Sequence, residues 1–111
     1  MTALGYSNGA SVAAASLLLR PEVFDSAILP RPMMPLPEAG PVNLSGKRVL
    51  IVRGRSDTVI PKPETDALEA ALRRAGADVC AVSLDADHRL TVEDRLVASR
   101  WIEAPEACLA A

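Results

Sequence analysis

The stretch Gly5-Tyr6-Ser7-Asn8-Gly9 decides the fold, because it joins an apolar, strand-like segment to a helix through a turn that needs small flanking residues. Met1–Leu4 before it has the character of the end of a strand. Asn8–Leu19 after it is rich in Ala and Leu and is stopped by Pro21, which predicts a helix. A serine at such a turn is held at the end of a sheet, and the next backbone N–H lies at a helix N-terminus. The stretch therefore predicts a βα unit with an exposed serine at its junction. The alternatives are a Gly-rich phosphate turn and an ordinary βα loop.

The rest of the chain alternates short apolar runs with amphipathic segments, which is the pattern of a parallel α/β sheet. We expect strands at Ser26–Leu29, Lys47–Val52 and Asp78–Leu84, and helices at Pro63–Ala75 and Thr91–Ile102. The segment from Pro30 to Pro41 holds five of the nine prolines and predicts neither helix nor strand. This pattern predicts a sheet of four parallel strands, with the crossover helices on one face and the last helix on the other.

The last helix carries two further predictions. Thr91 is its expected N-cap, and Asp94 lies three residues on, where a capping box places its second partner. The residues expected to face the sheet from this helix and its entry are Leu90, Leu96, Val97 and Trp101.

Composition argues against several classes of function. The net charge is −2, Lys and Arg are scattered and only 3% of residues are aromatic, which is unlike a nucleic-acid or anionic-membrane surface. The most apolar run, Ala10–Leu19, has about half of the ~20 residues that span a bilayer, and no segment has the pattern of a signal peptide. Cys80 and Cys108 lack the spacing of a metal site. They predict reduced thiols in a cytoplasmic protein.

Two more polar residues follow predicted strands. Asp57 lies in the loop after Lys47–Val52, and His88, the only histidine, lies in the loop after Asp78–Leu84. Taken singly, Asp57 fits a turn or a helix cap, and His88 fits a solvated surface loop. The carboxyl ends of parallel strands are where open α/β sheets bind ligands, so all three loops can converge there. The chain order Ser7, Asp57, His88 is that of one class of serine hydrolase and predicts a catalytic triad.

With these motifs the sequence resembles the phospholipase/carboxylesterase branch of the α/β hydrolases, especially its small dienelactone-hydrolase-like members. The matching stretches are GYSNGA at residues 5–10, AILPRPMMPL at 27–36, VLIVRGRSDTVIP at 49–61 and DHRLT at 87–91. The resemblance implies that residues 1–111 are the C-terminal part of a single α/β-hydrolase domain, with about four parallel strands and helices on both faces. The N-terminal strands and the loop that gives the second oxyanion donor would lie outside it.

The resemblance also implies an activity, the hydrolysis of carboxylic esters or thioesters, with a small-molecule ester as the partner and no metal or organic cofactor. The residues implied for the site are the nucleophile Ser7, the acid Asp57, the base His88, the backbone oxyanion donor Asn8, and the substrate-binding residues Tyr6, Met33 and Met34.

One departure and two alternatives accompany this prediction. Family members usually have Gly before the histidine, whereas Asp87 stands here and brings a second carboxylate that can compete for the imidazole. The first alternative is a truncated, non-catalytic product that acts only by associating with another chain. The strand ending at Leu4 would leave an open sheet edge, so we expect a homo-oligomer or pairing through that edge. The second, a nucleotide-binding βαβ module, lacks the phosphate-loop Lys and the G-x-G-x-x-G pattern.

Overall fold

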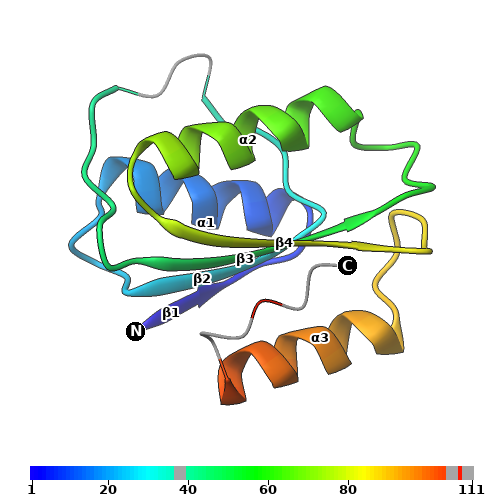
Figure 1. The fold of residues 1–111 in the computed structure, drawn as a ribbon. Helices are drawn as coiled ribbons and strands as arrows, with labels where there is room; N and C mark the ends of the chain where they lie inside the picture. Colours follow the sequence, from blue (N-terminus) through cyan, green and yellow to red (C-terminus); the bar gives the residue numbers. More distant parts are fainter. Residues whose placement is uncertain (37–39, 105–107, 109–111) are drawn as a thin grey trace.

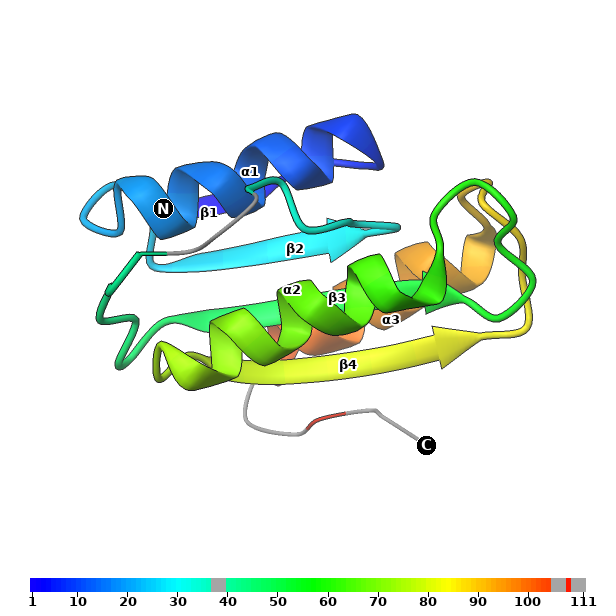
Figure 2. The same ribbon diagram turned by 90° about the horizontal axis from the view of Figure 1, so that it is seen from above.

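The computed structural model describes residues 1–36, 40–104 and 108, and its centre is a parallel sheet. The four strands are β1 (Thr2–Leu4), β2 (Ser26–Pro30), β3 (Arg48–Gly54) and β4 (Asp78–Leu84), side by side in chain order (Figure 2). Helices α1 (Asn8–Leu19) and α2 (Lys62–Arg74) cover one face, and α3 (Val92–Glu103) covers the other (Figure 1). The predicted arrangement, about four parallel strands with helices on both faces of the sheet, is confirmed.

Strand β3 shows why the sequence signal is strongest there. Its residues 49–52 are all 0% exposed, because the strand has neighbours on both sides and helices above and below. A strand buried on both faces is apolar at consecutive positions rather than at alternate ones. The strand continues to Gly54, two residues beyond the apolar run, so its end brings the Asp57 loop to the carboxyl edge of the sheet.

The core has one cluster on each face of the sheet. The larger cluster, under α1 and α2, includes Leu17, Leu29, Ile51, Leu68 and Leu72. The smaller cluster, against α3, consists of Ile28, Leu50, Val52, Cys80, Val82 and Trp101, with Val97 partly buried beside it. The prediction that Leu90 and Leu96 face the sheet is wrong, since each is 50% exposed. Helix α3 meets the sheet along a narrow stripe, and its buried residues are Asp94 and Trp101.

The helix ends agree closely with the sequence. Helix α3 begins with the predicted capping box, in which Thr91 Oγ1 accepts from the Asp94 N–H and the Asp94 carboxylate accepts from the Thr91 N–H. Helix α2 begins one residue before the predicted Pro63, which occupies the first turn, where a missing N–H costs nothing.

Among the described residues, no helix has the length and apolar character needed to cross a membrane.

A disulfide joins Cys80 in β4 to Cys108, with their Cα atoms 5.4 Å apart. The prediction of two reduced thiols is therefore wrong. The cysteines are 28 residues apart in the chain, and only the placement of α3 on the Cys80 face of the sheet brings them together. The expected cytoplasmic location loses the thiol argument on which it rested, because disulfides are typical of oxidising compartments.

Candidate active site

The serine of the opening motif lies at a sharp turn between β1 and α1. Ser7 has φ 55° and ψ −112°, a strained conformation for a residue other than glycine, and its N–H donates to the Pro30 carbonyl at 3.0 Å. Although Ser7 is the N-cap of α1, its side chain makes no capping hydrogen bond. The hydroxyl is therefore directed away from the helix and is available for another partner.

Close packing at this turn explains the glycine at position 5. A Cβ on Gly5 would overlap the backbone of Gly9, whereas a Cβ on Gly9 would meet nothing within 4 Å. We expect Gly5→Ala to lower the free energy of unfolding by about 3 kcal/mol, since the strand and helix must separate to accommodate the methyl group. Urea unfolding followed by Trp101 fluorescence measures this loss.

The matched control is Gly9→Ala, which removes a glycine from the helix and is expected to be neutral or to stabilise the chain by about 0.5–1 kcal/mol. Equal losses in the two variants would contradict this account of the turn.

Ser7, His88 and Asp57 form one continuous chain of hydrogen bonds. Ser7 Oγ lies 2.9 Å from His88 Nε2, and His88 Nδ1 lies 2.9 Å from Asp57 Oδ2. Their three loops follow β1, β4 and β3, so residues up to 81 positions apart meet at the carboxyl edge of the sheet. Both nitrogens of the single histidine are used, one toward the serine and one toward the carboxylate.

The Asp57 carboxylate is held from both sides. Its Oδ2 faces the imidazole, while Oδ1 accepts from the Val59 and Ile60 N–H groups at 2.8 and 2.9 Å. Burial raises the pKa of Asp57, but the hydrogen bonds from Ile60, His88 and Val59 outweigh it and hold this pKa below its ordinary value of 3.8. Asp57 is therefore ionised at neutral pH and suited to orient and stabilise an imidazolium.

Asp87, the residue that replaces the usual glycine, does not reach the imidazole. Its carboxylate accepts from the backbone N–H and the guanidinium of Arg89, which holds the pKa of Asp87 below its ordinary value. The carboxylate bonded to His88 is that of Asp57.

The remaining predicted site residues lie around Ser7. In the described part of the chain the Asn8 N–H has no acceptor, as is usual in the first turn of a helix. Asn8 also lines an open groove of about 420 Å³ together with Met33 and Met34. The Tyr6 hydroxyl donates to the His88 carbonyl at 2.7 Å, so this ring contacts the histidine loop.

Sequence reasoning missed Arg31, whose side chain is buried beside the histidine loop. A charged residue between two prolines, directly after a buried strand, is the signal that marks it. Its partners in the histidine loop and in α3 lie 56–63 residues further along the chain, and no local pattern identifies them.

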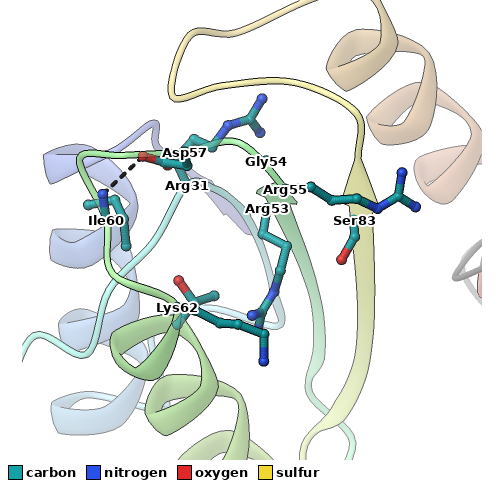
Figure 3. Close-up of a pocket in the computed structure, with 9 residues that line it drawn as sticks. Arg31, Arg53, Gly54, Arg55, Asp57, Ile60, Lys62 and Ser83 are labelled. Carbon is teal, nitrogen blue, oxygen red and sulfur yellow. Dashed lines mark hydrogen bonds between the residues drawn. The ribbon is translucent and has the colours of Figure 1, made fainter.

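A second pocket, of about 220 Å³, lies between the Asp57 loop and the start of α2 (Figure 3). Arg53 and Lys62 extend into it, but Arg53 is paired with Asp66 and Glu69, and Lys62 with Asp66. Neither the candidate nucleophile nor the candidate base lines this pocket. Of the three candidate triad residues, only Asp57 borders this pocket.

Several proteins similar to the chain carry the name of a hydrolase or a carboxylesterase. MhqD of Bacillus subtilis, which bears the name of a hydrolase, is 35% identical over 99 residues, covering 89% of this chain and 50% of MhqD. The crystal structure of a Bacillus cereus carboxylesterase matches with a TM-score of 0.89 at 33% identity, covering 93% of this chain and 49% of that one. A carboxylesterase from Mesorhizobium loti matches with a TM-score of 0.89 at 36% identity, covering 94% of this chain and 49% of that one. No family model matches the chain.

The chain spans about half the length of these relatives. The likeness extends over nearly all of it, at sequence identities well above those at which only a fold is shared. The chain belongs to the α/β-hydrolase superfamily and corresponds to the C-terminal portion of that fold.

Proposed function

We propose that this chain carries the catalytic triad of a serine hydrolase acting on carboxylic esters or thioesters. One observation carries the proposal, the unbroken hydrogen-bond chain from Ser7 Oγ through His88 to Asp57. A serine hydroxyl is a weak nucleophile until a base removes its proton, and His88 Nε2 lies at hydrogen-bond distance for that transfer.

The reaction takes two steps. Ser7 Oγ attacks the acyl carbon while His88 Nε2 takes the hydroxyl proton, and the imidazolium then gives that proton to the departing alkoxide or thiolate. Water next loses a proton to His88 and attacks the acyl-serine, which releases the carboxylic acid and returns the proton to Ser7. Asp57 keeps the imidazole in the tautomer with the proton on Nδ1 and stabilises the imidazolium.

The first turn of α1 and the methionine groove supply the substrate contacts. The Asn8 N–H lies beside Ser7 at the positive end of the helix, which suits it to the oxyanion, and α/β-hydrolase sites pair this donor with a second N–H. The groove lined by Asn8, Met33 and Met34 is the proposed acyl site, because flexible thioethers adapt to apolar groups of varied shape.

Covalent labelling tests the proposal. A fluorophosphonate probe should add one adduct per chain, detected by intact mass and assigned to Ser7 by peptide mapping. Ser16→Ala is the matched control, since Ser16 lies in the same helix but outside the groove, with its hydroxyl donating to the Val12 carbonyl, and this variant should label like the wild type. His88→Asn should abolish labelling. A folded wild-type chain that takes no label, or takes it elsewhere, would overturn the assignment.

The second candidate function is association, and the edge strand favours it. In the described residues β1 pairs only with β2, and Leu4 in β1 is 71% exposed. An unpaired, apolar strand edge is a template for another chain. We propose that the 111-residue chain forms a homo-oligomer, or pairs with a complementary chain, through this edge.

Sedimentation velocity over a range of concentrations is expected to show self-association of the chain. Leu4→Lys should shift the population toward monomer, because a charge on an edge strand opposes pairing. Leu19→Lys, on the exposed end of α1, is the matched control and should leave association unchanged. A monomer at every concentration would exclude the homo-oligomer.

A further inference from the structure

A single guanidinium contacts the backbone on both sides of the histidine. Arg31 Nε donates to the Asp87 carbonyl at 2.8 Å, and Nη2 donates to the Arg89 carbonyl at 3.0 Å. Those are the residues directly before and after His88. The carbonyl of His88 itself accepts from Tyr6. The histidine loop is thus fixed at three successive carbonyls, two of them by Arg31.

The guanidinium is itself fixed by a buried carboxylate. Arg31 Nη1 and Nη2 donate to Asp94 Oδ1 and Oδ2 at 2.7 and 2.9 Å, a bidentate pair with side chains 0% and 4% exposed. Asp94 is fixed in turn by the N–H and hydroxyl of Thr91 at the start of α3. Because the pair is neutral overall, it acts on the histidine loop through geometry rather than through net charge.

The backbone of Arg31 is held so that this side chain points inward. Its φ is 56°, in the left-handed region that an arginine rarely occupies, and its N–H donates to the Val52 carbonyl at 2.8 Å. Such a conformation persists only where the surroundings enforce it, and it is concentrated at functional sites. The strained backbone of Arg31 is thus found at the residue whose guanidinium contacts the His88 loop.

We propose that Arg31 is the positioning residue of the triad, which fixes the His88 loop so that Nδ1–H meets Asp57 and Nε2 meets Ser7. The catalytic consequence rests on the proposed function, whereas the orientation of the imidazole does not. The competing account is that Arg31 only fastens α3 to the sheet and leaves His88 to be oriented by Asp57 alone.

The tautomer of His88 distinguishes these accounts. His88 is the only histidine in the chain, so imidazole ¹⁵N chemical shifts belong to one residue without assignment by mutation. In the wild type we expect the tautomer with the proton on Nδ1. In Arg31→Lys the charge opposite Asp94 is kept, but one ammonium cannot reach both carbonyls as the planar guanidinium does. The neutral imidazole should then revert to the Nε2–H form that free histidine prefers.

Two further variants separate positioning from stability. Thr65→Val removes a buried hydrogen bond to the Pro32 carbonyl, next to Arg31, without touching the histidine loop, and it should keep the wild-type tautomer. Arg31→Met/Asp94→Leu removes both charges and provides a folded chain if Arg31→Lys does not fold; it too should lose the Nδ1–H tautomer. A wild-type tautomer in either folded Arg31 variant, or an unfixed tautomer in the wild type, would overturn the proposal.

Kinetics supply the second measurement. With an aryl acetate substrate, Arg31→Lys should lower kcat by about 10²-fold with KM nearly unchanged, the result expected when a base is displaced by about an ångström. If the wild type shows the Nδ1–H tautomer but hydrolyses no ester, the proposed function fails while the role of Arg31 stands. If Arg31→Lys keeps both tautomer and kcat, the role of Arg31 fails while the proposed function stands.

Discussion

On the proposed function, replacement of Ser7 by Ala is expected to lower kcat for ester hydrolysis by about 10⁵–10⁶-fold. The same loss is expected for His88→Ala, and a smaller one, by about 10⁴-fold, for Asp57→Asn. The three side chains form one hydrogen-bonded unit, so the nucleophile is not activated when any of them is removed. Initial rates with an aryl acetate measure the effect.

Pairs of these substitutions should cost little more than the worse single one, because the members of a triad act together. Asp87→Asn is the matched control for the acid, since its carboxylate lies next to His88 in sequence but is bonded to Arg89. Full activity in Asp57→Asn together with a loss in Asp87→Asn would show that the acid is wrongly assigned.

Asp94→Asn is expected to lower the free energy of unfolding by about 3–5 kcal/mol, because it leaves the buried Arg31 guanidinium without its counter-charge. Urea unfolding followed by the fluorescence of Trp101, the only tryptophan, measures the loss. Burial raises the pKa of Asp94, but hydrogen bonds from Arg31 and Thr91 outweigh it and hold this pKa below its ordinary value of 3.8. The stabilisation is therefore present above pH 3.8 and is lost as the pH falls below it, so the variant and the wild type should converge in acid.

The double variant Arg31→Met/Asp94→Leu tests the reason for that loss. With both charges removed no unpaired ion stays buried, and the loss should be no more than about 2 kcal/mol, much of it from the lost cap on α3. A double variant as unstable as Asp94→Asn would mean that packing around the pair, rather than an uncompensated charge, accounts for the effect.

Much of the fold was accessible from sequence because its signals are local. An apolar run such as Val49–Val52 and a Thr91/Asp94 capping box depend on residues within a few positions of one another. Element ends differ by one or two residues, where hydrogen bonding rather than composition sets the boundary. The exposure of Leu90 and Leu96 depends on the angle at which α3 meets the sheet, and no local pattern encodes that angle.

The candidate site was likewise predictable only where its signals were local. The prediction that Ser7, Asp57 and His88 lie together rested on their order in the chain and on their positions just after strands. In the structure the three side chains lie at hydrogen-bond distance. The competition between Asp57 and Asp87 could not be decided from sequence, because it depends on where Arg89 directs its guanidinium. The Arg31 contacts and the Cys80–Cys108 disulfide were missed because their partners are distant in the chain.

The sequential strand order has a consequence for how the protein is made. Paired residues in neighbouring strands lie about 20–30 positions apart, as Thr2 does from Ser26, whereas Ser7 and His88 are 81 positions apart. Contacts that close longer loops lose more chain entropy, so they form later unless other contacts have already drawn the ends together. As synthesis proceeds from the N-terminus, each new strand can add to the growing edge of the sheet in turn. By this order, the serine of the opening turn meets the imidazole only after β4 and the loop beyond it have been synthesised, so the Ser7–His88 hydrogen bond is among the last contacts of the fold to form.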